Sequence, residues 1–318
     1  MKISAIACNY NGAEFIADAV ESVLANQDPD LEVIVVDDGS TDASREILAQ
    51  YQNNPKVKLV FQDNLGQAGA FNAGINAAQG DTLCIFDGDD FWFPHKARTI
   101  REGIKTLGLG DEPWLIRHPL LSLYEHERTV VPRGRMTYDT PEGAKPIDLG
   151  EIKQTLSPKE VHAFIEADGF GIYGGGNFGG SSAMSRAMAE KVFPLPILSK
   201  YYGDMMPLYA GPIVGNFYIL ARDLGAYRFH GSNHSLTRKL EPLEFWDGMS
   251  EYLNRILQAE GIPVTADYKR SRRARPYLIA EGRSSEALEH AKRLYKQDKR
   301  LIELVKTHIL IAKSKTRR

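Results

Sequence analysis

The chain has only two cysteines among its 318 residues, and it lacks any long apolar run. Cys8 and Cys84 each lie within a short apolar segment, which is typical of small buried residues in a reducing compartment rather than of a disulfide. No apolar segment approaches the roughly 20 residues that cross a bilayer. Met1-Lys2-Ile3 opens directly into a strand-like segment instead of a signal peptide. These absences predict a cytoplasmic protein.

Two familiar nucleotide-binding motifs are also missing. The first predicted strand is followed by Asn9-Tyr10-Asn11-Gly12 and not by the Gly-x-Gly-x-x-Gly pattern of dinucleotide-binding enzymes. The chain also has no Gly-Lys-Ser/Thr loop of the P-loop type. These absences argue against a hydride-transferring dehydrogenase and against a P-loop NTPase.

The composition is that of a folded globular protein, with 43% hydrophobic and 25% charged residues. A net charge of -2 conceals an asymmetry, because Lys269 to Arg318 hold sixteen Lys and Arg against five Asp and Glu. The basic run Lys269–Arg275 is of a kind that attracts anionic lipid, nucleic acid or an acidic partner, although solvated charge without a partner is the commoner outcome. We take docking on a membrane surface as the hypothesis for this region.

Apolar periodicity alternates between strands and helices over the first hundred residues. Strands are predicted at Lys2–Cys8, Leu31–Val36, Val57–Phe61 and Thr82–Phe86, and helices at Ala13–Ala25, from the N-cap candidates Ser40-Thr41-Asp42 to about Tyr51, and at Gly66–Ala78. This order predicts an α/β fold with a mainly parallel sheet flanked by helices. Helical spacing from Glu244 onward adds a helical C-terminal appendage.

Two groups of aspartates follow strands of this predicted sheet. Asp37 and Asp38 come after the second strand, and Asp87-Gly88-Asp89-Asp90 after the fourth. Unpaired carboxylates resist burial, so both groups are expected at the carboxyl edge of the sheet, where open α/β folds bind ligands. Carboxylates gathered at such an edge usually hold a hard cation, and a cation beside a nucleotide indicates phosphate chemistry.

Several short segments, in order, resemble the family 2 glycosyltransferases, which have the GT-A nucleotide-sugar-binding fold. The segments are Asn9-Tyr10-Asn11, Ser22-Val23-Leu24, Val35 to Asp42, Asn64-Leu65-Gly66, Asn72-Ala73-Gly74, Gly80-Asp81 and Phe86 to Asp90. Each alone is a weak signal, but their order and spacing together are specific. The resemblance covers roughly residues 1 to 100 closely and 170 to 235 more loosely.

The resemblance assigns roles to the second acidic group. It implies that Asp87 meets the ribose or a metal-bound water, and that Asp89 ligates Mn²⁺ or Mg²⁺. Gly88 has no side chain to crowd the phosphates. Asp90 either caps the next helix or orients its neighbour.

The first acidic group resembles the base-recognition acids of the family. A carboxylate accepts the N3–H of uracil or thymine, and Asp38 is marginally favoured over Asp37 for that contact. Tyr10 supplies a flat surface for stacking of the base, and Asn9 and Asn11 belong to the same nucleotide-sugar-binding loop.

One position departs from the family pattern. Phe71 stands where many relatives carry an Arg that contacts the base or phosphate. Gln67 or Asn72 is the candidate to replace part of that contact.

Two later segments complete the site that the resemblance implies. Asp204, in Gly203-Asp204, is the candidate catalytic base that removes the proton of the acceptor hydroxyl. The alternative is a helix N-cap, and both roles are compatible. In Tyr227 to Ser235, His230 is the candidate second metal ligand and Arg228 a secondary phosphate contact.

The resulting hypothesis divides the chain into a GT-A domain at 1–240, with donor half 1–100 and acceptor half 101–240, and a helical basic region at 241–318. The expected reaction is inverting transfer of a sugar from an NDP-sugar, with a UDP-sugar favoured, to an acceptor hydroxyl in cell-envelope or polysaccharide synthesis. The acceptor is a glycan, a lipid-linked molecule or another hydroxyl compound, and no nucleic-acid partner is expected. The alternatives are a nucleotidyltransferase that makes NDP-sugars and a silent sugar-nucleotide or glycan-binding module.

Overall fold

The computed structural model describes residues 1–124, 181–220, 222–233, 243–267, 278–280, 282–283, 285–289 and 292. The chain forms two compact units. The first comprises Met1–Thr155 and Gly174–Thr237, and the second Leu156–Tyr173 and Arg238–Arg318. The basic run Lys269–Arg275 lies outside the described residues.

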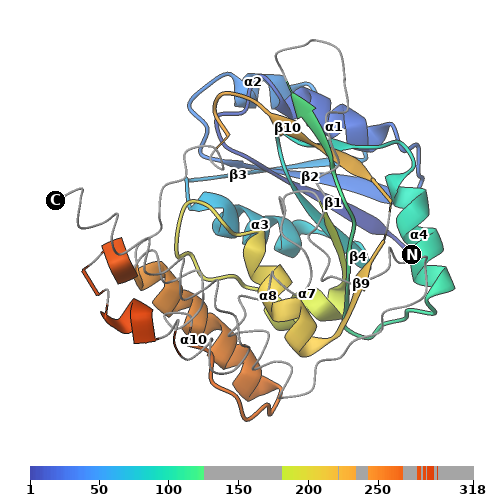
Figure 1. Ribbon diagram of the computed structural model, residues 1–318. Helices are drawn as coiled ribbons and strands as arrows, with labels where there is room; N and C mark the ends of the chain where they lie inside the picture. The colour runs from blue at the N-terminus through green and yellow to red at the C-terminus, as the bar shows by residue number, and fades with distance from the viewer. Residues whose placement is uncertain are drawn as a thin grey trace. The chain divides into compact units, whose positions relative to one another are not determined.

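A seven-stranded sheet forms the centre of the first unit, with the order β3-β2-β1-β4-β8-β6-β9 (Figure 1). The strands are β1 (Ile3–Asn9), β2 (Leu31–Asp38), β3 (Val57–Gln62), β4 (Thr82–Asp87), β6 (Trp114–Arg117), β8 (Ser182–Ser185) and β9 (Asn216–Ile219). Every pairing is parallel except those of β8, which runs antiparallel to β4 and β6. The predicted α/β fold with a mainly parallel sheet is therefore confirmed.

A second, three-stranded sheet has the order β5-β10-β7. Its strands are β5 (Phe91–Trp92), β7 (Leu121–Tyr124) and β10 (Gly225–Phe229). β10 pairs antiparallel with β5 and parallel with β7. Since β5 directly follows Asp90, this pairing brings the end of β10 next to the second acidic group.

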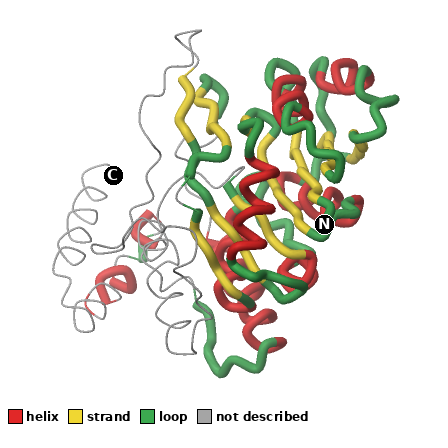
Figure 2. Tube along the Cα trace, turned by 90° about the vertical axis from the view of Figure 1, so that its right-hand side faces the viewer, coloured by secondary structure: helices red, strands yellow, loops and turns green. Residues whose placement is uncertain are grey.

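Helices cover both faces of the central sheet (Figures 1 and 2). On one face lie α1 (Ile16–Leu24), α2 (Ser44–Ala49) and α4 (Lys96–Thr106), and on the other α3 (Gly66–Ala77), α7 (Arg186–Val192) and α8 (Met205–Val214). Alternate residues of β1 point to opposite faces, so Ile3, Ala5 and Ala7 pack with α1 and α4 in one core cluster. Ile6 faces α3, where a Cβ on Gly74 would collide with it.

Several predicted boundaries differ from the observed ones. The first helix begins at Ile16 rather than Ala13. The residue at the N-cap of α2 is Ala43, which makes no side-chain cap bond. Asp42 instead accepts hydrogen bonds from the backbone N–H groups of Ala13 (2.9 Å) and Ser44 (3.0 Å), so it joins two loops.

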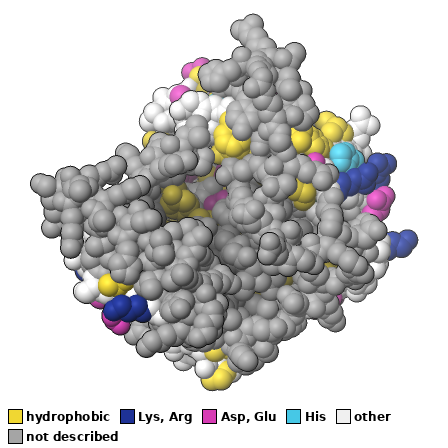
Figure 3. Space-filling model, viewed as in Figure 1, with side chains coloured by type: hydrophobic (Ala, Val, Ile, Leu, Met, Phe, Trp, Pro, Cys, Tyr) yellow, Lys and Arg dark blue, Asp and Glu magenta, His cyan; other side chains and the backbone are white. Residues whose placement is uncertain are grey.

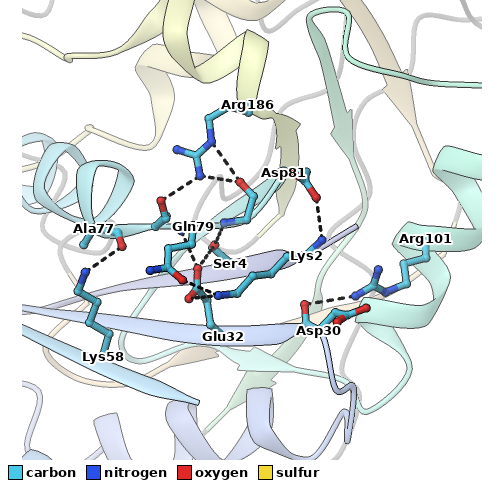
Figure 4. Close-up of polar contacts among 12 residues, drawn as sticks. Lys2, Ser4, Asp30, Glu32, Lys58, Ala77, Gln79, Asp81, Arg101 and Arg186 are labelled. Carbon is cyan, nitrogen blue, oxygen red and sulfur yellow. Dashed lines mark hydrogen bonds and ion pairs between the residues drawn. The ribbon is translucent and has the colours of Figure 1, made fainter. Parts of the chain in front are cut away.

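The amino ends of β1, β2 and β4 are joined by a polar network (Figure 4). Lys2 forms an ion pair with Glu32 at 2.7 Å, and the Ser4 hydroxyl donates to the same carboxylate at 2.6 Å. Arg186, at the start of α7, donates to the carbonyl oxygens of Ala78 and Gly80. This network fixes the edge of the sheet opposite to the strand carboxyl ends.

The second unit contains α10 (Leu243–Ala259), which confirms the helix predicted from Glu244, and a helical segment at 285–289. Asn254 of α10 exchanges two hydrogen bonds with the backbone of Ala266 (2.7 and 3.0 Å), which ties the following loop to the helix.

No helix among the described residues has the length and hydropathy to cross a membrane. In Figure 3, Lys and Arg side chains of described residues are visible at the right edge and at the lower left of the face.

Candidate active site

Both acidic groups end at the same edge of the sheet. β1 lies between β2 and β4, all three are parallel, and the register pairs Asn9 with Asp37 and Cys8 with Asp87. Burial raises the pKa of the Cys8 thiol, and nearby negative charges raise it further. Those charges belong to Asp87, Asp38, Asp89 and Asp204. Carboxylates from β2, from β4 and its following turn, and from the start of α8 therefore surround one point at this edge.

Asp87, Asp89 and Asp90 offer ligand oxygens that lie within 4.8 Å of one another. Burial raises the pKa of Asp87 well above its usual value, and the charges of Asp204 and Asp89 add to the effect. Burial, followed by the charges of Asp89 and Asp87, does the same to Asp90. Like-charged oxygens crowded out of water would be stabilised by a cation, and hard divalent cations prefer an all-oxygen set. The cluster therefore fits such an ion.

His230 lies directly after β10 and reaches the second acidic group. Its Nε2 is 2.9 Å from Oδ2 of Asp89, and its Nδ1 is 2.7 Å from the hydroxyl of Ser232. The ring lies against Phe15, with 4.4 Å between ring centroids. The structure thus brings together the two residues that the sequence named as metal ligands.

Arg228 lies between aromatic rings on β10. Its guanidinium is 4.9 Å from the ring centroid of Phe15 and 4.5 Å from that of Phe91. It donates to the carbonyl oxygen of Asp89 (3.1 Å) and to the carboxylate of Asp18 (3.2 Å). These contacts fix the guanidinium beside the acidic turn, where we predicted a phosphate contact.

Asp90 accepts a hydrogen bond from the backbone N–H of Arg228 at 3.3 Å. This bond joins the acidic turn to β10, and both roles predicted for Asp90 stay predictions.

Asp37 and Asp38 are buried within the last two positions of β2, two residues beyond the predicted end of the strand. Asp38 accepts hydrogen bonds from the side chain of Gln62 (2.7 Å) and from the backbone N–H groups of Leu65 (2.9 Å) and Gly66 (2.8 Å). Asp37 accepts from Arg45 at 2.8 Å, and also from Asn9 and the backbone of Ser40. Both carboxylates therefore organise the loops at the carboxyl edge of the sheet.

The end of β1 and the loop that follows it contain Asn9, Tyr10 and Asn11, which were predicted to bind the nucleotide. Tyr10 is 49% exposed, which leaves its ring available for stacking. Asn9 is buried and donates to Asp37 (3.1 Å), whereas Asn11 accepts from the backbone N–H of Thr41 (2.7 Å) and adopts a positive φ of 51°. The two asparagines hold the loop, and Tyr10 projects from it.

Gly88 is required by packing within the protein. A Cβ at this position would lie 2.9 Å from the carbonyl oxygen of Cys8 and 3.2 Å from Ile16. Contacts with β1 and α1 therefore exclude a side chain at Gly88, and the predicted room for phosphates stays a prediction.

Gln67 and Asn72 are both in α3, and each reaches the segment before α8. Asn72 exchanges two hydrogen bonds with the backbone of Leu195, at 2.7 and 2.9 Å. The side chain of Gln67 donates to Asp87 at 2.6 Å and accepts from the backbone N–H of Asp204 at 3.2 Å. Phe71, between them, is fully buried.

Asp204 occupies the N-cap position of α8, but its side chain forms no cap hydrogen bond. Burial raises the pKa of Asp204 to about 6, against the opposing effects of nearby backbone N–H groups and of the charge of Arg117. A carboxylate with a pKa near neutrality is suited to general-base chemistry.

Two residues near the site were missed from the sequence. Arg117, at the end of β6, is buried and supplies the positive charge that acts on Asp204. Asn233 accepts from the backbone N–H of His230 (2.5 Å) and donates to the carbonyl oxygen of Arg228 (3.1 Å). The sequence did offer a signal for Arg117, because the apolar run that begins at Trp114 ends in this charged residue.

The chain is similar to known glycosyltransferases. The profile described as Glycosyl transferase family 2 matches residues 4–109. An uncharacterized glycosyltransferase of Nostoc sp. is 33% identical over 240 residues, which is 74% of this chain and 67% of the relative. The succinoglycan biosynthesis protein ExoO of Rhizobium meliloti is 38% identical over 107 residues, or 33% of this chain and 30% of that protein.

The fold is shared with solved structures. A crystal structure of S. aureus TarS 1-349 in complex with UDP-GlcNAc superposes with a TM-score of 0.59 at 16% identity, and the match covers 99% of this chain and 89% of that chain. At that identity the likeness establishes the fold alone.

Proposed function

Because this chain belongs to glycosyl transferase family 2 and has the GT-A fold of glycosyl-transferring enzymes, we propose that it transfers a sugar from a UDP-sugar to an acceptor hydroxyl with inversion. One observation carries the proposal. Asp204, a buried carboxylate with a pKa of about 6, is linked through a single glutamine to the aspartate cluster at the end of β4. A base and a cation site in one place are what inverting transfer requires.

We assign each of these side chains a role in binding the diphosphate or activating the acceptor. Asp89 and His230, 2.9 Å apart, would hold Mn²⁺ or Mg²⁺, and Asp87, in the same oxygen cluster, would meet the ribose or a metal-bound water. The bound cation supplies charge that offsets the negative charge of the departing diphosphate. Arg228, fixed between two rings beside the acidic turn, adds positive charge for the same phosphates. Asp204 accepts the proton of the acceptor hydroxyl, and inversion then needs no covalent intermediate.

Recognition of the nucleotide rests on the loops that follow β1 and β2. The exposed ring of Tyr10 stacks on the base, and Asp38, or alternatively Asp37, meets its N3–H. A neighbour of the same fold that is described as bound to UDP-GlcNAc supports uridine as the base. Asn9 and Asn11 hold the loop in place.

The acceptor is proposed to be a growing glycan or a lipid-linked precursor in polysaccharide or cell-envelope synthesis. Support comes from the relative named for succinoglycan biosynthesis. The chain spans 67% of the first relative but only 30% of that second one. The family match favours a transferase over a nucleotidyltransferase or a silent binding module.

A nucleotide panel and one variant test the proposal. UDP with Mn²⁺ is expected to raise the melting temperature, while GDP and CMP are not. The Asp204→Asn variant should bind UDP within about threefold of wild type but hydrolyse UDP-sugars about 10²- to 10⁴-fold more slowly, the range of a lost general base. If UDP and Mn²⁺ leave the protein unaffected, or if the variant keeps full turnover, the proposal is wrong.

A further inference from the structure

The side-chain amide of Gln67 connects two acidic residues that are 117 positions apart in the sequence. Its Nε2 donates to Oδ1 of Asp87 at 2.6 Å, and its Oε1 accepts from the backbone N–H of Asp204 at 3.2 Å. Asp87 ends β4, and Asp204 begins α8. One neutral side chain therefore spans the gap between the cation cluster and the residue proposed as the base.

The backbone around Gln67 allows little adjustment of this gap. Gln67 N–H donates to the carbonyl oxygen of Lys200 at 3.0 Å. A Cβ on Gly66 would lie 2.7 Å from the Cα of Lys200, and one on Gly203 would lie 2.6 Å from the backbone nitrogen of Ala68. The first turn of α3 and the segment 199–204 are thus packed backbone against backbone, where only glycine fits.

A second amide holds the same segment farther along α3. Asn72 binds the backbone of Leu195 through both its oxygen and its nitrogen. This contact fixes the chain that leads toward α8, but it reaches neither acid. Gln67 alone among the described residues of α3 has hydrogen bonds to both Asp87 and Asp204.

An amide suits this position because it donates at one end and accepts at the other without adding charge. A lysine could not accept from the Asp204 N–H, and a glutamate could not donate to Asp87 when ionised. We infer that Gln67 is a positioning residue that fixes the placement of Asp204 relative to Asp87, instead of contacting the nucleotide. This inference rests on the proposed function.

A double-mutant comparison tests it. Gln67→Met keeps the length and shape of the side chain but removes both hydrogen bonds. If Gln67 acts by placing Asp204, the variant should lower kcat for UDP-sugar hydrolysis at least about tenfold in the wild-type background, but less than about threefold in Asp204→Asn, because residues that act as a unit are not additive. If Gln67 had only a structural role, Gln67→Met would lower kcat by the same factor in the wild-type and Asp204→Asn backgrounds.

A binding measurement adds a readout that does not depend on turnover. Titration of Mn²⁺ into the UDP complex, followed by electron paramagnetic resonance, should show weaker Mn²⁺ binding in Gln67→Met with either residue at position 204, because the bond to Asp87 is lost in both. Gln52→Met, at an exposed position outside the site, is the matched control and should change neither quantity. If Gln67→Met does not fold, Gln67→Asn retains a buried amide that is too short to span both acids, and the same comparison applies.

The outcomes separate the two proposals. Equal losses of kcat in both backgrounds, or unchanged Mn²⁺ affinity, would overturn the role of Gln67 and leave the proposed function standing. Absence of metal-dependent turnover in the wild type would overturn the proposed function and this inference with it.

Discussion

At the level of a single residue, burial of the Asp204 carboxylate lowers the stability of the folded protein when the group is ionised. Burial raises the pKa of its carboxyl to about 6, well above the usual range of an aspartate. The ionised form that a general base requires is therefore disfavoured by the fold. Proteins commonly keep such residues because activity depends on them.

The sign of this effect gives a stability prediction for Asp204→Asn. Since the folded state binds the proton more tightly, wild-type stability should fall as pH rises from about 4 to 6 and stay lower above that window. The asparagine variant has no charge to bury, so it should be more stable than wild type by about 1–3 kcal/mol at pH 7, and the difference should vanish near pH 4. Urea unfolding of wild type and variant from pH 4 to 8 in EDTA measures the free energy of unfolding of each protein at each pH.

Asp63→Asn, at an exposed position, is the control and should track wild type across the same pH range. A constant difference between Asp204→Asn and wild type at every pH would contradict the prediction, because it would show that the titration of Asp204 has no part in it.

The sequence predicts which residues gather at the site better than it predicts their contacts. The acids after β2 and β4 stand out because charged residues end apolar runs. Asp38, however, accepts hydrogen bonds from Gln62, Leu65 and Gly66, which lie on a loop whose path no local pattern specifies. Gln67 stood out only as a replacement for a missing Arg. Its bond to the Asp204 backbone spans 137 positions and depends on the tertiary fold.

At the level of elements, β1 and β2 have different tasks at their two ends. Their carboxyl ends carry Asn9 and Asp37, whereas their amino ends carry Lys2, Ser4 and Glu32, held by the network in Figure 4. Burial pushes the pKa of Glu32 upward, but hydrogen bonds from Lys2, Ser4 and a backbone N–H outweigh it, and the net effect lowers the pKa. Ligands bind at the carboxyl edge in such folds, so stability and function separate along the same strands.

Glu32→Gln should therefore reduce stability without reducing turnover. A lowered pKa means that the stabilisation is present above the unfolded-state pKa and is lost as pH falls through the folded-state value. We expect a loss of about 1–3 kcal/mol at pH 7 and a smaller loss at pH 3, because a charge-assisted hydrogen-bond network is removed. Urea unfolding at the two pH values measures this, and kcat at pH 7 should remain within about twofold, since ligands bind at the opposite edge.

Glu46→Gln, exposed in α2, serves as the control for a change of charge alone. A large fall in kcat for folded Glu32→Gln would refute the separation of the two edges.

Elements with strong apolar periodicity were predicted to within one to three residues, and those specified by distant partners were not. The four parallel strands beginning at residues 3, 31, 57 and 82 are apolar, so their pattern located them. The second sheet was missed because β5 has two residues and pairs with β10, more than a hundred positions away. The start of the first helix was placed too early because the bond from Ala13 to Asp42 holds the preceding loop in a nonhelical path.

At the level of the whole molecule, charge is divided along the chain. The first 268 residues contain 23 Lys and Arg against 36 Asp and Glu, whereas the last fifty contain sixteen against five. The acidic part includes the cluster that fits a cation. The basic part includes the run Lys269–Arg275, which lies outside the described residues. An acidic surface is repelled by anionic lipid and a basic one is attracted, so the two parts should respond differently to a charged membrane.

Binding to vesicles tests whether this asymmetry recruits the protein to a membrane surface, where lipid-linked acceptors reside. Wild-type protein should float with phosphatidylcholine vesicles that contain phosphatidylserine but not with pure phosphatidylcholine, and added salt should weaken the binding. Each basic residue near an anionic surface contributes about 1 kcal/mol. Replacing Arg270, Arg272 and Arg273 with Gln in the full chain should therefore reduce binding at least about tenfold.

Replacing the exposed Lys58, Arg98 and Lys105 with Gln removes the same charge from the acidic part and should have a smaller effect. Equal reductions in the two triple variants would mean that net charge alone drives the association, and unchanged binding in the first would exclude the basic run as the contact.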